Sequence, residues 1–379
     1  MEQEIPITPV SEEMVSVSRS VIDQYEKRIQ ELTVEMTKRV PMILTFQGTI
    51  DQPPIPPMGM IKQASGNDEA TVNHWKQIWL DHIRKNKEKH DIVANSAATM
   101  HAKFAYNPVI IAGSGPSLKK NAFLLKDKPD KIGLVSCLHN YAFFVDLGLH
   151  VDGGYLNLDA GDITIPEMSQ GGQHPEQYYW DSTVDNTLVA GLVSKPELID
   201  KWKGPIKWFS SPVPDKVYME EERKILGDFT LYYNVGGNAL GAAYYHARAI
   251  LGGMPLAFIG TDFSFDYCHK FHSWDSPYDA QFQGVMPCTD VFGNRVYTWP
   301  SYNNFCLWLT YQAYGGSGMN PVQMINCTEG GIFGAFPQGN VSAIKQLALI
   351  DFLEMYRHHL QLPKLQADPD VLKRSTLLF

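Results

Sequence analysis

The chain has 379 residues and a formal net charge of −9, and 19% of its residues are charged. A chain of this length can bury a large core, and its acidic balance gives no strong basic field, which argues against a nucleic acid as partner. Its five cysteines are few and scattered. We therefore expect no disulfide scaffold, and we expect the protein to be in a reducing, cytoplasmic compartment.

Neither a secretory leader nor a membrane span is expected. Met1–Glu4 is acidic, and no apolar core follows it. The stretch 241–260 is apolar, but it contains His246 and Arg248 and is broken by Gly-Gly-Met-Pro at 252–255. This pattern favours a helix followed by a strand, so we expect no membrane as partner.

The first part of the chain is predicted to be a helical extension. Apolar residues recur every three or four positions over Ser11–Arg39, which indicates an amphipathic helix. Its apolar stripe contacts either the body of the protein or a second copy in a homo-oligomer. Prolines within 50–66 predict an extended connection. A second helix is expected over 69–95, with Trp75 and Trp79 on its inward side.

The rest of the chain alternates between predicted strands and helices. Short apolar runs predict strands at 109–112, 131–136, 153–158, 187–192, 206–209, 256–259 and 322–325. Helices are expected at 118–125, 139–147, 238–251 and 341–358. This alternation predicts an α/β fold with a mostly parallel sheet and helices on both faces. The predicted division is a helical N-terminal extension at 1–105, the α/β domain at 106–335 and a C-terminal helical segment at 336–379.

The run P-V-I-I-A-G-S-G-P-S-L at Pro108–Leu118 has the pattern of a strand, a glycine turn and a helix. Gly113 and Gly115 let the backbone approach a ligand closely, and Ser117 can cap a helix whose dipole end is positive. A phosphate is the usual ligand of such a loop, here formed by Gly113, Ser114, Gly115, Pro116 and Ser117. The alternative is a plain βα turn in which Ser117 only caps the helix.

Polar residues also follow other predicted strands, and in a parallel sheet the carboxyl ends of the strands are where ligands bind. Gly236, Gly237 and Asn238 offer a second helix N-terminus, although the two glycines would equally serve tight helix packing. The other candidates are Asn140, Asp159, Asp162, Thr261, Asp262, Thr328, Glu329 and Gly330.

Three kinds of chemistry fit these residues. Asp262, a few residues past a buried strand, is placed to bind a ribose hydroxyl, a sugar or a metal ion. His272 has the side chain of a general base, with His269 as the second choice. Asp159 and Asp162 would hold magnesium if the reaction uses it; no other cofactor is expected.

Four segments carry a family resemblance: I-I-A-G-S-G-P-S-L at 110–118, G-G-N-A-L-G-A-A at 236–243, I-G-T-D-F-S-F at 259–265 and I-N-C-T-E-G-G at 325–331. Together they resemble the family that joins bacterial motility accessory factor glycosyltransferases to archaeal hydroxymethylpterin pyrophosphokinases. The first and third are also similar to those of bacterial sialyltransferases, in which the G-x-G-P-S loop lies against the nucleotide. The resemblance implies a Rossmann-like fold.

The glycosyltransferase branch implies transfer of a nonulosonic, sialic-acid-like sugar from CMP to a hydroxyl of flagellin or another surface component. By this resemblance, the CMP moiety contacts the two glycine loops and Asn140. Asp262 and Glu329 orient the sugar, and His272 or His269 accepts the proton. Further substrate contacts are assigned to Asp159, Thr261, Thr328 and Gly330.

Two other functions stay open at this point. The pterin branch implies transfer of a diphosphate from ATP with magnesium, with Asp159, Asp162 and Asp262 as metal or diphosphate partners. In its favour, Asp159 is followed by Ala160, where the glycosyltransferase pattern has proline. Thr328–Gly331 instead resembles the flagellin-modifying members. The third option is a catalytically silent nucleotide-binding protein, and the acceptor is not identified by the sequence.

Overall fold

The computed structural model describes residues 58–266, 285–315, 322–336, 339–340 and 343–359. These residues all belong to one compact unit, Ile50–Phe379. The helix predicted over Ser11–Arg39 lies outside the described residues.

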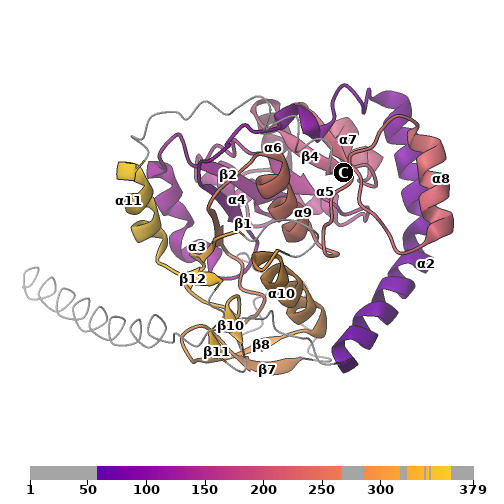
Figure 1. Cartoon of the computed structure of the whole chain (residues 1–379). Coiled ribbons are helices and arrows are strands. Elements are labelled where there is room, and N and C mark those ends of the chain that lie inside the picture. The colour runs from indigo at the N-terminus through magenta and orange to yellow at the C-terminus, as the bar shows by residue number, and fades with distance from the viewer. Residues whose placement is uncertain (1–57, 267–284, 316–321, 337–338, 341–342, 360–379) are drawn as a thin grey trace, which may run out of the picture. The chain divides into compact units, whose positions relative to one another are not determined.

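An eight-stranded sheet forms the centre of this unit (Figure 1). Its order is β12-β9-β6-β1-β2-β3-β4-β5, and every neighbouring pair is parallel. The predicted α/β fold is therefore confirmed. The strands are β1 (Val109–Ala112), β2 (Gly133–Cys137), β3 (Tyr155–Asn157), β4 (Leu188–Gly191), β5 (Ile206–Phe209), β6 (Leu256–Ile259), β9 (Met324–Asn326) and β12 (Ile344–Gln346).

The strand order reverses between β1 and β6. Strands β1 to β5 follow one another in one direction across the sheet, and the chain then returns to the opposite side of β1 to add β6, β9 and β12. Ala112 of β1 is in register with Ile259 of β6, so the loops that follow these two strands leave the sheet side by side. This is the topological switch point at which parallel α/β sheets usually bind ligands.

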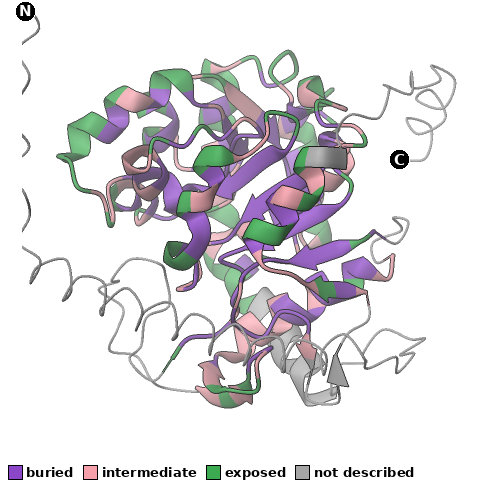
Figure 2. Ribbon diagram, turned by 90° about the vertical axis from the view of Figure 1, so that its left-hand side faces the viewer, coloured by how far each residue is buried: buried purple, intermediate pink, exposed green. Residues whose placement is uncertain are grey.

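Helices cover both faces of the sheet (Figure 2). Alternate residues of a strand pack in the two layers. Ile110 and Ala112 pack in one layer, whereas Val109 and Ile111 pack in the other. The first layer holds α2 (Met58–Lys89), α3 (Leu118–Asn121), α4 (Tyr141–Asp146), α5 (Thr164–Glu167), α6 (Glu176–Ser182), α7 (Pro196–Lys201), α8 (Lys216–Leu226) and α11 (Leu349–His359). The second holds the 3₁₀ turn Ala97–Met100, α9 (Ala239–Tyr245) with its π-helical continuation His246–Ile250, and α10 (Pro300–Ala313).

The structure corrects three predicted elements. The connection predicted over 50–66 is helical from Met58, because its prolines all precede that residue and a helix can begin directly after Pro57. This helix, α2, ends at Lys89 rather than at Asn95. The helix predicted over 341–358 is wrong at its start, where β12 adds a strand to the sheet before α11 begins at Leu349.

The segment 285–313 had no predicted structure and forms an antiparallel hairpin followed by α10. The hairpin pairs β7 (Met286–Thr289) with β8 (Arg295–Thr298), and it lies near the small pair β10 (Ala335–Phe336) and β11 (Gly339–Asn340) in Figure 1. Phe265, after β6, exchanges backbone hydrogen bonds with Tyr297 of β8. The hairpin is thereby attached to the loop at the switch point.

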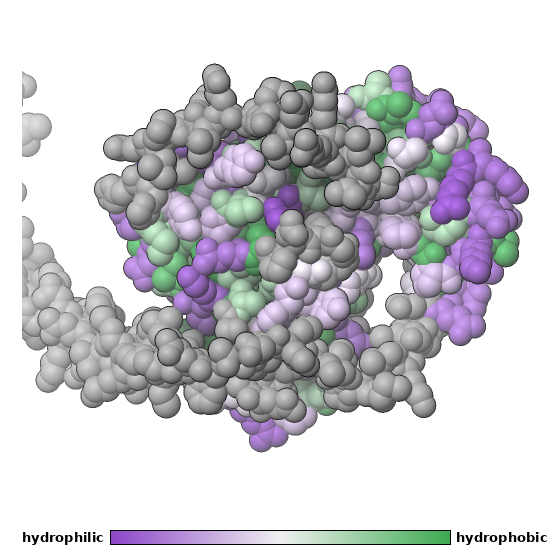
Figure 3. Space-filling view, in the orientation of Figure 1, coloured by the Kyte–Doolittle hydropathy of each residue, from purple (hydrophilic) through white to green (hydrophobic). Residues whose placement is uncertain are grey.

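The outer surface is polar along α2 and α8, where hydrophilic side chains gather on the face seen in Figure 3. Among the described helices, none combines the length and the apolar character needed to cross a bilayer. The predicted domain ranges stay predictions, although α2 belongs to the same compact unit as the sheet and β12 extends the sheet beyond residue 335.

Candidate functional site

The loop after β1 packs directly onto the loop after β6. The amide of Gly113 donates to the carbonyl of Ile259 at 2.9 Å, and that of Gly115 donates to the carbonyl of Gly260 at 2.7 Å. The amide of Ser117 donates to Oδ2 of Asp262 at 3.3 Å. Three of the amides predicted to bind phosphate therefore have partners within the protein.

Asp262 fills the space in front of the β1 loop. The hydroxyl of Ser117 donates to its Oδ2 at 2.7 Å, and the residue is 5% exposed. Burial raises the pKa of Asp262 to about 6, against the opposing effects of the Ser117 hydrogen bonds and the charge of Lys120. A Cβ on Gly115 would lie 2.1 Å from Oδ2, so only glycine fits this approach.

The loop after β9 closes the same region. The amide of Thr261 donates to Oγ1 of Thr328 at 3.1 Å. Glu329 accepts hydrogen bonds at Oε1 from Asn121 Nδ2 and from the amide of Leu349, each at 3.0 Å. A Cβ on Gly330 would lie 3.7 Å from Oδ1 of Asp262. We call Gly113–Ser117, Thr261, Asp262 and Thr328–Gly331 the switch-point cluster.

Asn140 lies beneath this cluster with its side chain fully buried. Its Nδ2 donates to the carbonyl of Gly113 at 3.0 Å, to that of Ala112 at 3.3 Å and to Oγ of Ser136 at 3.1 Å. The predicted contact of Asn140 with a base or ribose stays a prediction, and the observed contacts hold the end of β1 in place.

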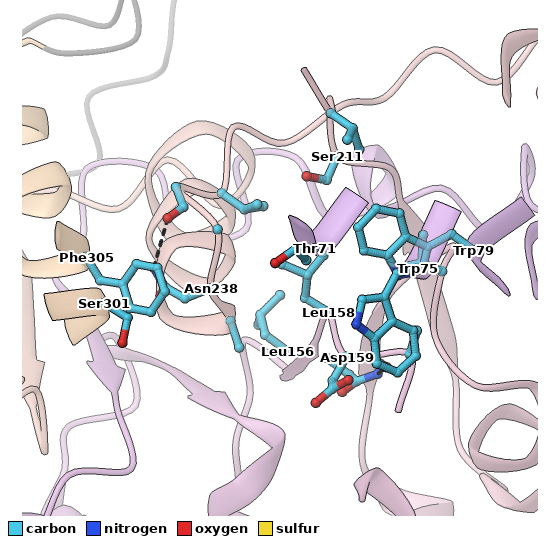
Figure 4. Close-up of a pocket in the computed structure, with 18 of the residues that line it drawn as sticks. Thr71, Trp75, Trp79, Leu156, Leu158, Asp159, Ser211, Asn238, Ser301 and Phe305 are labelled. Carbon is cyan, nitrogen blue, oxygen red and sulfur yellow. Dashed lines mark hydrogen bonds between the residues drawn. The ribbon is translucent and has the colours of Figure 1, made fainter. Parts of the chain in front are cut away.

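A cavity of about 1070 Å³ lies at the same edge of the sheet. It extends over the ends of β2, β3 and β5, between α2 and α10. Trp75 and Trp79 line one side, and Phe305 lines another (Figure 4). Trp308, three positions after Phe305 on α10, is also a lining residue. All four rings are half-buried, so each presents part of its surface to the cavity.

The polar lining of the cavity is rich in carboxylate, amide and hydroxyl groups. At its wall, Nε2 of His139 pairs with Oε1 of Glu167, whose side chain is 7% exposed. The exposed residue Asp159 accepts the amide of Gly161 at Oδ1, at 2.7 Å. Among the described residues that line the cavity there is no lysine or arginine. The other polar lining residues include Asn157, Ser211, Asn234, Asn238, Ser301 and Asn304.

Gly236, Gly237 and Asn238 line the cavity rather than the switch-point cluster. Asn238 caps α9, because its Oδ1 accepts the amide of Gly241 at 2.8 Å. Gly236 has a φ of 58°, and a Cβ there would lie 2.3 Å from Cδ2 of Trp308. Gly236 therefore lies close against α10, while its role in binding a nucleotide stays a prediction.

The structure thus divides the predicted site residues into two groups. The switch-point cluster and Asn140 form the first, and Asp159 with Gly236–Asn238 belongs to the second. Asp162 is in neither, because its side chain is 95% exposed and pairs with Lys195. The described residues contain no group of three or more His, Cys, Asp or Glu that would hold a metal ion. His269 and His272 lie outside the described residues.

Sequence reasoning missed most of the cavity wall. Trp75 and Trp79, four positions apart on α2, were expected to face inward, and they do so at the cavity. His139 and Glu167 had no assigned role, and α10 was not predicted at all. Only the i, i+4 spacing of the tryptophans signalled a shared surface.

A parallel sheet with polar loops gathered at its switch point defines the doubly wound, Rossmann-like class. Residues 82–267 match the family described as 6-hydroxymethylpterin diphosphokinase MptE-like. This match confirms the resemblance found in the sequence. The match includes β1 to β6, and it leaves out Trp75, Trp79 and the whole of α10.

The chain is also similar to a solved structure, that of the MAf glycosyltransferase from Magnetospirillum magneticum AMB-1. The TM-score is 0.46 and the sequence identity is 14%. The similarity covers 79% of this chain and 41% of that protein, so the chain spans less than half of its length. No curated protein matches the chain.

Proposed function

We propose that the protein is a glycosyltransferase that moves a sugar from a CMP-activated donor to a hydroxyl group. The observation that carries this proposal is the cavity lined by aromatic rings and by carboxylate, amide and hydroxyl groups at the carboxyl edge of the sheet. Aromatic rings pack against the C–H faces of sugars, and the polar groups can pair with sugar hydroxyls. The position of the cavity beside the switch point is typical of substrate sites in this class.

The donor nucleotide is proposed to lie against the loop Gly113–Ser117. The donor sugar is proposed to be a nonulosonic acid, on the resemblance of this loop to that of the CMP-using sialyltransferases. In this arrangement the donor phosphate takes the place of the Asp262 carboxylate at the amide and hydroxyl of Ser117. Asp262 then turns toward the sugar, which is the role that the resemblance implies for it.

The transfer is proposed to proceed by direct displacement. The acceptor oxygen forms a bond to the anomeric carbon, the bond from that carbon to the phosphate oxygen breaks, and CMP leaves with the electron pair. The hydroxyl proton passes to His272 or, failing it, to His269. Replacement of the true base by alanine should lower the turnover number by about a hundredfold or more. Full transfer by both the His272→Ala and His269→Ala variants would contradict this assignment.

Calorimetry of the purified chain with CMP, CTP and ATP, each with and without magnesium, tests the nucleotide. Saturable binding of CMP without magnesium is the expected result. Transfer of radiolabelled sugar from CMP-N-acetylneuraminic acid, or its accelerated hydrolysis, is the matching activity assay. Binding of ATP only, or of no nucleotide, would contradict the proposal.

A magnesium-dependent diphosphokinase is the second candidate, favoured by the family that residues 82–267 match. Flat aromatic walls and the exposed carboxylate of Asp159 also suit a heterocyclic substrate such as a pterin. This candidate predicts ATP binding that requires magnesium, with no affinity for CMP. The same titrations therefore separate the two functions.

A further inference from the structure

We propose that the cavity binds a neutral, hydroxyl-rich glycan, which serves as the acceptor. The inference deepens the proposed function, on which the word acceptor rests. The class of ligand follows from the lining and the size of the cavity alone. In this arrangement the acceptor lies between α2 and α10, and the acidic donor sugar lies at the switch-point cluster.

The aromatic residues form two separate walls. Trp75 and Trp79 stand one turn apart on α2, and Phe305 and Trp308 stand one turn apart on α10. Figure 4 shows Trp75 and Trp79 on one side of the cavity and Phe305 on the other, with Leu156 between them. Each wall can contact the C–H face of a pyranose ring, whose C–H bonds are apolar while its hydroxyls point outward.

The charge of the lining selects against an anionic ligand. Of the two carboxylates in the lining, Glu167 pairs with His139, whereas the exposed Asp159 has no lysine or arginine beside it among the described lining residues. A phosphate, or the carboxylate of a sialic acid, would meet charge of its own sign in a partly dry site. Neutral hydroxyls avoid this repulsion and can both donate to Asp159 and accept from amides such as Asn304.

The size of the cavity indicates more than one sugar ring. Its volume of about 1070 Å³ lies just above the ~300–1,000 Å³ that is usual for small-molecule sites. The aromatic walls come from α2 residues 75 and 79 and from α10, all outside the family match at 82–267. The preference for a glycan is therefore a property of the helices that flank the family segment in this chain.

Calorimetric titration with three neutral trisaccharides, maltotriose, cellotriose and chitotriose, tests the inference, with 3′-sialyllactose as the acidic probe. At least one neutral probe should bind saturably at millimolar concentration or below, and 3′-sialyllactose should bind more weakly. Trp75→Ala should weaken that binding about tenfold, and Trp75→Phe, which keeps a ring, should weaken it less.

Tyr311→Ala is the matched control, since Tyr311 is an exposed aromatic residue on α10 that does not line the cavity. Its affinity should equal that of the unchanged protein. Phe305→Ala gives an independent test from the opposite wall, should Trp75→Ala not fold. Thermal unfolding of each variant reports on its folding.

The outcomes separate this inference from the proposed function. If CMP binds and none of the three neutral probes does, or if 3′-sialyllactose binds best, the glycan inference is wrong and the transferase proposal stands. If a neutral probe binds but CMP does not, the proposed function is wrong and the glycan site stands. Unchanged affinity in folded Trp75→Ala or Phe305→Ala would show that the glycan binds elsewhere.

Discussion

The switch-point cluster and the cavity lie along the same edge of the sheet, but they use their polar groups differently. In the cluster, the amides of Gly113, Gly115 and Ser117 donate to neighbouring loops, and Asp262 is almost fully buried. In the cavity, Asp159 is exposed and four aromatic rings are only half-buried. Glycines and carboxylates at strand ends can therefore serve loop packing as much as ligand binding. Aromatic rings that stay partly exposed are instead typical of a surface that binds a ligand.

The largest expected effect is the loss of stability when a glycine of the switch-point cluster is replaced. Gly331 has a φ of 72°, and a Cβ there would lie 2.4 Å from the Cα and the carbonyl oxygen of Asp262. Gly331→Ala should lower the free energy of unfolding by about 3 kcal/mol or more, because backbone strain and overpacking add. Denaturant titration measures this loss.

Gly148→Ala is the matched control for that change. Gly148 also has a positive φ, 67°, but nothing lies within 4 Å of the position of its Cβ. Only the backbone strain remains, so the loss should be about 1 kcal/mol. Equal losses in the two variants would mean that the loops of the cluster are not tightly packed.

The second effect is the pH dependence contributed by Asp262. Its pKa is raised to about 6 in the folded protein from an ordinary value of 3.8, so the folded state holds the proton more tightly than the unfolded state. The corresponding stability is present below about pH 4 and is lost as the pH rises through about 6. The effect of Asp262→Asn on the free energy of unfolding should therefore depend on pH. Relative to the unchanged protein, the variant should be about 2–3 kcal/mol more stable at about pH 8 than it is at about pH 4.

Unfolding titrations of both proteins at the two pH values measure that difference. A difference near zero would mean that water reaches the carboxylate and that the cluster is as open as the cavity. The same variant bears on the donor site: if phosphate replaces the Asp262 carboxylate at Ser117, Asp262→Asn should bind CMP more tightly at neutral pH.

The smallest expected effect on stability is in the cavity. Asp159 is exposed, so Asp159→Asn should change the free energy of unfolding by no more than about 0.5 kcal/mol. It should nevertheless lessen the discrimination against 3′-sialyllactose, because the exposed carboxylate of the cavity is removed. Denaturant titration measures the stability, and calorimetric titration with 3′-sialyllactose and a neutral probe measures the discrimination. A large loss of stability would mean that the Asp159 carboxylate contributes to loop packing, as the buried carboxylate of Asp262 does.

The strands and the loops that follow them were predictable because their signals are local. The strands at 206–209 and 256–259 were predicted to the residue, and Gly113–Ser117 and Asp262 lie at the switch point, as strand order requires. That Asp262 would bind Ser117 was not predictable, because 145 positions of sequence separate the two. A strand-end motif predicts where a loop lies, but it does not predict which distant residue the loop contacts.

The cavity was predictable only in part. The spacing of Trp75 and Trp79 gave an inward face, but the same spacing suits a buried core. Phe305 and Trp308 belong to a helix whose apolar residues surround it on most sides, so no clear periodicity marked α10. The error at 341–358 has a related cause: β12 is only three residues long, and its pairing with β9 is a tertiary contact that local propensity does not report.

The position of β1 in the middle of the sheet has a consequence for the order in which the chain is made. β1 pairs with β2 on one side, but its other neighbour, β6, begins only at Leu256. While the chain is being synthesised, one side of Val109–Ala112 is therefore an unpaired apolar edge until more than half of the protein has emerged from the ribosome. A growing chain that stops before β6 exposes to other chains the same strand that carries the first loop of the switch-point cluster.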